Sequence, residues 1–162
     1  MESLQDQTAA LPAGSLNREE QKRVAAIAAA DLVDSEMTVG LGSGSTAGYF
    51  IEELGVRLRG GRLTDVVGIP TSHITARQSR EAGVRTHELT EHPIHIAVDG
   101  ADQVGPELNL IKGAGGALLR EKLVASAAET FVVAVDQSKL VRAVELAFRF
   151  RLKWPASAIA AS

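Results

Sequence analysis

A short loop of glycines and hydroxyl residues, Gly-Ser-Gly-Ser-Thr at 42–46, lies between a predicted strand and a predicted helix. Gly42 and Gly44 permit close backbone approach and positive φ angles. The helix that follows offers unpaired amides and the positive end of its dipole. The hydroxyl groups come from Ser43, Ser45 and Thr46. The loop is neither a Walker loop nor GxGxxG; it suits a phosphate monoester, or is an ordinary glycine turn with a hydroxyl helix cap.

A pair of carboxylates, Asp99 and Asp102, flanks Gly100 and Ala101 directly after an apolar run. Two carboxylates in so tight a turn could bind a metal, move protons or hold sugar hydroxyls, or they could simply cap the turn. Gln103 stands where another acid would strengthen the case for magnesium, and no third acidic ligand is evident nearby. We therefore assign no metal ligands.

The third cluster is a lysine on a glycine-rich loop, Lys-Gly-Ala-Gly-Gly at 112–116, followed by Glu121 on a predicted helix. Such a lysine can neutralise a phosphate or a developing oxyanion. On a helical wheel Glu121 falls on an arc of small apolar residues, where partial desolvation would raise its pKa towards that of a useful general base. The alternative is a solvated glutamate paired with a neighbouring cation. The arc consists of Ala117, Val124, Ala125 and Ala128.

An alternation of apolar and helical segments must position these clusters. Strands are predicted over 37–41, 65–69, 84–86, 94–98 and 131–135, and helices over 18–34, 47–59, 73–82 and 116–128. This alternation favours an α/β fold, a Rossmann-like and mostly parallel sheet covered by helices. Ligands of such sheets bind beyond the carboxyl ends of the strands. The loops at 42–46, 70–73 and 99–102 should therefore converge on one crevice.

Composition narrows the classes of partner. The chain has 162 residues, with 17 Lys and Arg against 20 Asp and Glu and a net charge of −3. This balance, with only six aromatic residues (one Trp, one Tyr, four Phe), argues against nucleic-acid binding. There is no cysteine, and no apolar run is long enough to span a membrane. Residues 1–16 are predicted to be a disordered leader without a secretory signal, so we expect a cytoplasmic protein with a small-molecule ligand.

The three clusters together resemble the type A ribose-5-phosphate isomerase family. The similarity runs from about Glu20 to Val141 and is strongest over 39–47, 69–72, 98–102 and 108–125, with Asp-Gln-Ser-Lys at 136–139 following. It implies interconversion of D-ribose 5-phosphate and D-ribulose 5-phosphate in the pentose phosphate pathway, without metal or cofactor. A catalytically inactive phosphosugar-binding module is the main alternative. A related sugar-phosphate deaminase or CoA-transferase-like protein fits the combined motifs less well.

The resemblance also implies a role for each matched residue. Glu121 would be the proton acceptor of an enediolate mechanism, Lys112 would stabilise the oxyanion, and Asp99 and Asp102 would assist ring opening or move protons between oxygens. The phosphate end would be held by Ser43, Gly44, Ser45 and Thr46, with Lys139 as a further substrate contact and Lys22 as a weaker candidate. Gly100 and Ala101 would line the sugar, and Gly113, Ala114 and Gly115 would complete the lysine loop. Ala114 replaces a family glycine, which would be costly if that position needs a positive φ.

After about Val141 the resemblance stops. We therefore divide the chain into a main α/β domain at 17–141 and an aberrant tail at 142–162, where the family continues with a small lid and oligomerisation domain. A family-like homodimer or homotetramer is expected, but the altered C-terminus places it in doubt. Without that domain, an exposed apolar face should make the chain poorly stable and prone to aggregate.

A frameshift near residues 141–147, in the gene or its sequencing, would explain the tail. One permitted coding of residues 148–154, read two bases later, gives Pro-Leu-Pro-Val-Glu-Val, close to what the family has there. We predict that the DNA downstream of residue 140 encodes a continuing lid domain in a shifted frame. Sequencing that DNA is the test, and a region without such a frame would leave a divergent or truncated C-terminus as the explanation.

Overall fold

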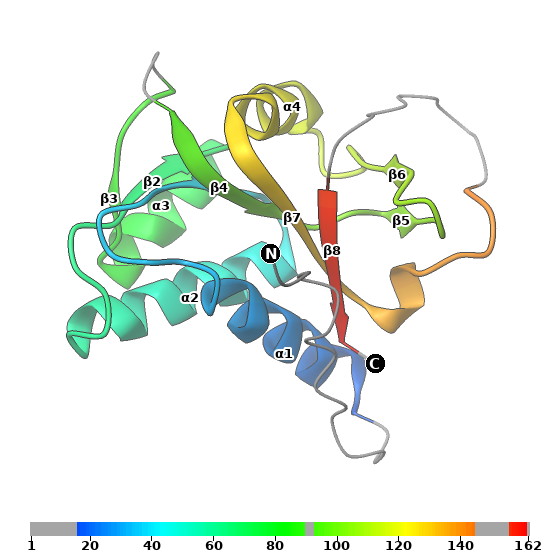
Figure 1. Ribbon diagram of the computed structural model, residues 1–162, viewed down its shortest axis with the longest axis horizontal. Helices are drawn as coiled ribbons and strands as arrows, with labels where there is room; N and C mark the ends of the chain where they lie inside the picture. Colours follow the sequence, from blue (N-terminus) through cyan, green and yellow to red (C-terminus); the bar gives the residue numbers. More distant parts are fainter. Residues whose placement is uncertain (1–15, 90–92, 145–155, 162) are drawn as a thin grey trace, which may run out of the picture.

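A six-stranded parallel sheet forms the centre of the molecule (Figure 1). The computed structural model describes residues 16–89, 93–144 and 156–161. The strand order is β3-β2-β1-β4-β7-β8, so the chain changes direction across the sheet between the neighbours β1 and β4. Such a switch point opens a crevice beyond the strand ends. The strands are β1 Thr38–Leu41, β2 Val67–Pro70, β3 Arg85–Thr86, β4 Ile94–Asp99, β7 Ala128–Asp136 and β8 Ala156–Ala161.

Helices cover both faces of the sheet, as the predicted α/β class requires. In Figure 1, α1, α2 and α3 lie on one side and α4 on the other. The core has two parts: one packs the apolar faces of α1 and α2 against the sheet, and the other packs Val124 and Ala125 of α4 against Ala97, Phe131 and Val133. The helices are α1 Arg18–Ala30, α2 Ser45–Arg59, α3 His73–Ala82 and α4 Leu118–Ser126, with a 3-10 turn η1 at Gln137–Lys139.

Local capping chemistry sets the start of α1 and both ends of α3. Asn17 and Glu20 form the capping box that their spacing predicts, and Ser72 accepts a hydrogen bond from the amide of Thr75 at the start of α3. Gly83 ends α3 in the left-handed conformation. Helix α1 ends at Ala30, earlier than predicted, because the chain turns there and the amide of Val33 bonds to the carbonyl of Ala30.

Several details differ from the sequence predictions. Residues 103–111 contain a two-stranded antiparallel hairpin, β5 Gln103–Val104 and β6 Leu110–Ile111, where no strand pairing was predicted. Pro70 is the last residue of β2 rather than its stop, because it occupies the end of the ladder opposite Leu41. Residues 156–161, assigned to the aberrant tail, form β8 beside β7. The predicted leader lies outside the described residues except for Leu16.

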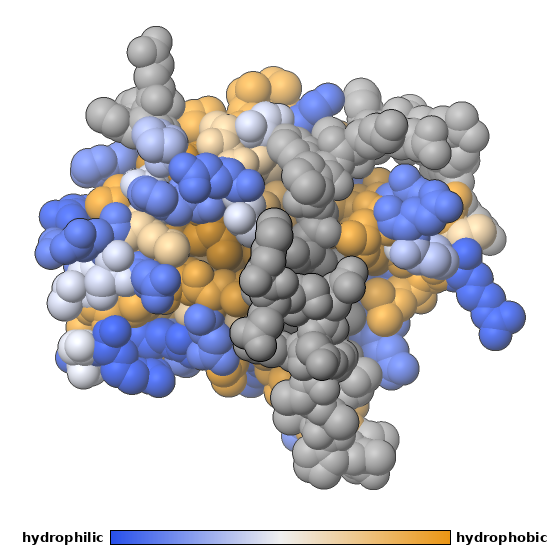
Figure 2. All heavy atoms as spheres, viewed as in Figure 1, coloured by the Kyte–Doolittle hydropathy of each residue, from blue (hydrophilic) through white to orange (hydrophobic). Residues whose placement is uncertain are grey.

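Helix α4 presents apolar side chains on its outer surface. Leu119 and Leu123 of this helix are 75 % and 50 % exposed. Figure 2 shows an orange area at the top of this face, over α4.

Gly40 of β1 sets how closely α4 can approach the sheet. A Cβ at this position would lie 2.6 Å from Cγ1 of Val124 and 2.7 Å from Cβ of Ala97. Both distances are too short for carbon atoms in contact. The glycine therefore lets the helix that carries Glu121 sit against the ends of the central strands.

We predict that Gly40→Ala lowers the free energy of unfolding by about 1–3 kcal/mol, the usual cost of overpacking a core. The matched control is Gly48→Ala in α2, where the nearest atom to a new Cβ is Nε2 of Gln78 at 3.5 Å. That change should be neutral or stabilise by up to about 1 kcal/mol, because alanine favours the helix. Urea unfolding of both variants provides the comparison, and equal effects would contradict the packing argument.

Candidate active site

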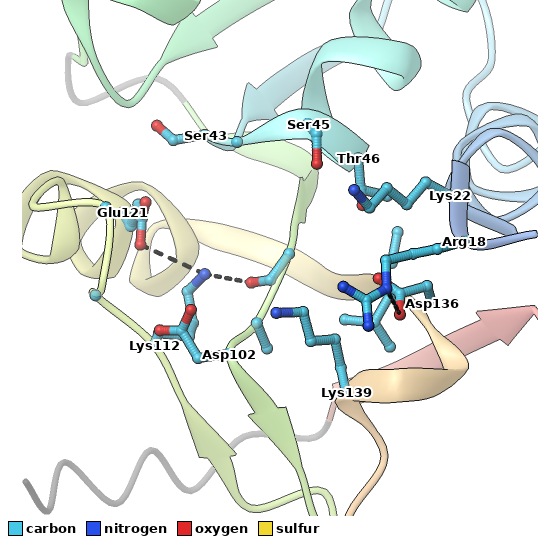
Figure 3. Close-up of a pocket in the computed structure, with 17 residues that line it drawn as sticks. Arg18, Lys22, Ser43, Ser45, Thr46, Asp102, Lys112, Glu121, Asp136 and Lys139 are labelled. Atoms are coloured by element: carbon cyan, nitrogen blue, oxygen red, sulfur yellow. Dashed lines mark hydrogen bonds and ion pairs between the residues drawn. The ribbon is translucent and has the colours of Figure 1, made fainter. Parts of the chain in front are cut away.

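A pocket of about 240 Å³ opens beyond the carboxyl ends of β1, β4 and β7. The loops after β1 and β4, the lysine loop and the start of α4 all contribute to its wall (Figure 3). The prediction that separate loops meet in one crevice is confirmed for 42–46 and 99–102. The 70–73 loop lies behind this wall, where it contacts Ser43 through hydroxyl groups.

A buried carboxylate–lysine–carboxylate arrangement occupies one end of the pocket. Nζ of Lys112 lies 2.9 Å from Oδ2 of Asp99 and 3.4 Å from Oε2 of Glu121, and it also donates to the carbonyl of Gly100. The side chains of Lys112, Asp99 and Glu121 are only 7 %, 5 % and 6 % exposed. Lysine has three donors, so these three oxygens account for all of them.

The two carboxylates of this arrangement have different surroundings. Oδ1 of Asp99 accepts hydrogen bonds from the amides of Ser43, at 3.0 Å, and Gly100, at 2.7 Å. Burial raises the pKa of Glu121 above its ordinary value, and the charge of Asp99 raises it further, while Lys112 opposes the rise. The helical-wheel prediction of a desolvated Glu121 is therefore confirmed, and its solvated alternative is wrong.

The opposite end of the pocket is cationic. Arg18 and Lys22, one turn apart on α1, and Lys139 of η1 all line it. Ser45 and Thr46 begin α2 at the same end, after Gly44 with a φ of 93°. The hydroxyl of Ser45 points into the pocket in Figure 3, and within the described residues it has no protein partner. Cationic side chains beside a helix N-terminus form a site suited to an anion.

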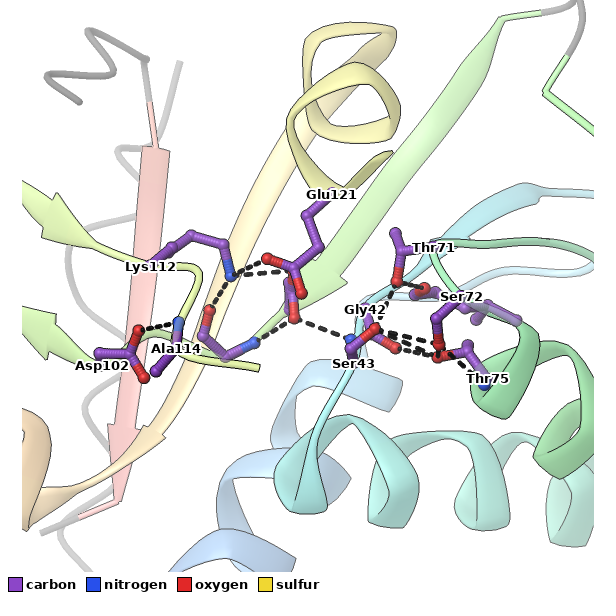
Figure 4. A network of polar contacts seen from close by, with 12 residues as sticks. Gly42, Ser43, Thr71, Ser72, Thr75, Asp102, Lys112, Ala114 and Glu121 are labelled. Atoms are coloured by element: carbon purple, nitrogen blue, oxygen red, sulfur yellow. Dashed lines mark hydrogen bonds and ion pairs between the residues drawn. The ribbon is translucent and has the colours of Figure 1, made fainter. Parts of the chain in front are cut away.

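Ser43 lines the pocket, but its polar groups already have protein partners. Its amide donates to Asp99, and its hydroxyl lies 2.9 Å from Oγ1 of Thr71, 3.3 Å from Oγ1 of Thr75 and 3.4 Å from Oγ of Ser72 (Figure 4). We call these four residues the hydroxyl cluster. Its role in ligand binding is thus less direct than that predicted for the loop as a whole.

The lysine loop is shaped by two glycines. Gly113 and Gly116 have φ angles of 105° and 82°, whereas Ala114 does not have a positive φ. Ala114 therefore carries no backbone strain, and its amide donates to Oδ2 of Asp102 at 3.1 Å. Asp102 lines the pocket, as do Gly100, Ala101, Gly113 and Gly115.

The structure separates the predicted site residues into two groups. Asp99 and Ala114 do not line the pocket, whereas the other predicted residues line it. Sequence reasoning missed Arg18 and Asp136. Arg18 lies four residues before Lys22, a helical spacing that could have indicated it. Asp136 is buried and accepts hydrogen bonds from the amide and hydroxyl of Ser138, with Nε of Arg18 at 3.9 Å.

Two further features of the described residues bear on the class of site. No group of three or more His, Cys, Asp or Glu among them could hold a metal ion. No helix in this part of the chain is long and apolar enough to cross a membrane.

His95, one of four histidines, has a structural contact: its Nδ1 accepts the amide hydrogen of Thr38 and thereby joins two strands.

Fold and pocket together define an α/β protein with a glycine- and serine-rich loop at a helix N-terminus and a buried acid–lysine pair at a topological switch point. Residues 67–152 match the family model of ribose 5-phosphate isomerase A, also called phosphoriboisomerase A. This chain belongs to that family.

Individual relatives agree. The chain is 52 % identical over 120 residues to ribose-5-phosphate isomerase A of Methanothermobacter thermautotrophicus, covering 74 % of this chain and 53 % of the relative. It is 46 % identical over 142 residues to probable ribose-5-phosphate isomerase 1 of Arabidopsis thaliana, covering 87 % and 53 %. A solved D-ribose-5-phosphate isomerase in complex with phospho-erythronic acid superposes with a TM-score of 0.77 at 45 % identity, over 78 % of this chain and 56 % of that one. The chain thus spans about half the length of these relatives.

The raised pKa of Glu121 predicts a specific dependence of stability on pH. A carboxyl whose pKa is higher in the folded than in the unfolded state favours folding below its unfolded pKa, and that contribution is lost as pH rises through the folded pKa. Glu121→Gln, which stays uncharged, should therefore unfold at higher urea than the wild type at neutral pH. The difference should shrink towards pH 4, and urea titrations across this range would show it; a gap that widens in acid would contradict the assignment.

Proposed function

We propose that this chain interconverts D-ribose 5-phosphate and D-ribulose 5-phosphate through an enediolate. The observation that carries the proposal is the position of Glu121, a buried carboxylate of raised pKa 3.4 Å from the ammonium of Lys112. The names of the relatives support the same reaction. The pocket supports it independently, because its cationic end and its acid–lysine end match the two ends of an open-chain sugar phosphate.

Glu121 is proposed as the base that transfers the proton between carbons. Starting from the open-chain aldose, it takes the proton from C2, the C1 carbonyl oxygen becomes the enediolate oxyanion, and the proton returns to C1 to give the ketose. A raised pKa suits this cycle, since the carboxyl must both accept and return a proton near neutral pH. When Glu121 becomes neutral, its hold on Lys112 weakens, and the third N–H of the lysine is then available to the oxyanion.

Different roles follow for the two aspartates. Asp99 receives hydrogen bonds from two amides and from Lys112 and does not line the pocket, so we assign it the positioning of Lys112. Asp102 lines the pocket, where its carboxylate can carry the proton that must leave O2 for O1 as the carbonyl moves. This assignment divides a task that the sequence had given to both residues.

The phosphate is proposed to bind at the cationic end. Ser45 and Thr46 can donate hydroxyl and amide hydrogens, and Lys22 and Lys139 supply charge. Holding the phosphate there places the carbonyl end of the sugar near Glu121, because both ends belong to one pocket. Positioning of this kind supplies much of the rate enhancement available to an enzyme with a single reacting ligand.

The setting of the reaction is also a proposal. We place it in the pentose phosphate pathway of the cytoplasm, with a sugar phosphate as ligand and a homodimer or homotetramer as the assembly. Because the chain spans about half of each relative, activity of the chain by itself is the point that an assay must decide. The alternative, a phosphosugar-binding module, has no need of a desolvated carboxylate beside a lysine.

Replacing the base gives the direct test. We predict that Glu121→Gln lowers kcat by at least about a hundredfold, the usual contribution of general acid–base catalysis, while the affinity for ribose 5-phosphate stays within a few-fold. The matched control is Glu129→Gln, the same change at an exposed position of β7, which should leave both unchanged. Coupled turnover assays and calorimetry provide the two readings, and near-normal turnover by Glu121→Gln would remove it as the base.

A further inference from the structure

The hydroxyl cluster leaves Ser43 with no hydrogen to offer a ligand. Oγ1 of Thr71 donates to the carbonyl of Leu41 at 2.8 Å, and Oγ1 of Thr75 donates to the carbonyl of Gly42 at 3.0 Å. Each hydroxyl carries a single hydrogen, so both threonines can only accept from Ser43. The hydrogen of the Ser43 hydroxyl is therefore committed to the cluster.

The amide of Ser43 is committed as well, because it donates to Oδ1 of Asp99 at 3.0 Å. A phosphate dianion presents only acceptor oxygens, and the remaining lone pairs of Ser43 would repel them. Ser43 thus differs from Ser45, two residues later, whose hydroxyl is turned into the pocket (Figures 3 and 4).

The contacts of Ser43 lead instead to the catalytic lysine. Its hydroxyl fixes the loop against Thr71 and Thr75, which are 3 % and 1 % exposed, and its amide then points at Asp99. Asp99 in turn contacts Lys112 at 2.9 Å through its other oxygen. Gly42 takes part in the same packing, because a Cβ there would collide with the side chain of Asp99.

We propose that Ser43 is a positioning residue, which orients Asp99 and through it Lys112, and that it is not a ligand of the phosphate. The inference rests on the proposed isomerase function. It predicts opposite kinetic signatures for two serines of the same loop. Ser43 acts on the step in which charge develops on the substrate, and Ser45 acts on binding.

The experiment compares Ser43→Ala with Ser45→Ala. Ser43→Ala should lower kcat by about tenfold, the scale of one lost hydrogen bond, with KM and the calorimetric affinity for ribose 5-phosphate within about threefold of wild type. Ser45→Ala should weaken affinity by about tenfold with a smaller change in kcat. Ser43→Thr, which keeps the hydroxyl, should restore kcat. Ser79→Ala is the control for loss of a buried hydroxyl, since the hydroxyl of Ser79 donates to the carbonyl of Thr75 in the same helix.

A double-mutant cycle tests the connection within the cluster. Thr71→Val removes the nearest acceptor of the Ser43 hydroxyl, so its effect on kcat should not fully add to that of Ser43→Ala. Equal loss of affinity in Ser43→Ala and Ser45→Ala would show that Ser43 is a ligand and overturn the proposal, as would a normal kcat in Ser43→Ala. Binding is measured without turnover. A wild-type chain that binds ribose 5-phosphate but does not isomerise it would defeat the proposed function, and the affinities of the two serine variants would still decide whether Ser43 is a ligand.

Discussion

The ammonium group of Lys112 lies between the two buried carboxylates of Asp99 and Glu121. The electrostatics of this end of the pocket depend on how one positive charge is shared between these two negative ones. A single positive charge cannot neutralise two negative ones, and burial makes the excess negative charge costly. Asp99 also receives two amide hydrogens, so its charge is the better stabilised of the two. The cost therefore falls on Glu121, whose pKa rises. The arrangement therefore costs local stability when Glu121 is charged, and it makes Glu121 easier to protonate.

The parallel sheet makes this arrangement possible by bringing distant strand ends together. Asp99 ends β4, which lies beside β1, and the loop after β1 supplies the amide that holds its carboxylate. Glu121 lies on α4, which covers the face of the sheet away from α1 and α2. Its carboxylate reaches Lys112 because Gly40 leaves room for α4 close to the sheet. The cationic end of the pocket is built from the layer that contains α1 and the start of α2. The acid–lysine end and the cationic end of the pocket thus draw on helices from different faces of one sheet.

The glycine and hydroxyl residues of the 42–46 loop have different positions and contacts, which the motif by itself does not indicate. Gly44 turns the chain into α2, and Gly42 makes space for Asp99. Ser45 faces the pocket, whereas Ser43 faces the hydroxyl cluster. Ser43 therefore adjoins the acid–lysine end of the pocket and Ser45 adjoins the cationic end, a difference that the motif alone does not indicate.

Sequence by itself determined the alternation of strands and helices, the capping of α1 and α3, and the apolar arc that buries Glu121, because each depends on residues a few positions apart. It also identified the family through motifs that lie within single loops. Tertiary structure alone decided that Asp99 does not line the pocket, that the Ser43 hydroxyl packs in the hydroxyl cluster, and that Arg18 and Asp136 meet at the cationic end of the pocket. Those contacts join residues far apart in the chain, such as Ser43 and Asp99, 56 positions apart, and their geometry follows from strand order and helix packing rather than from any local pattern.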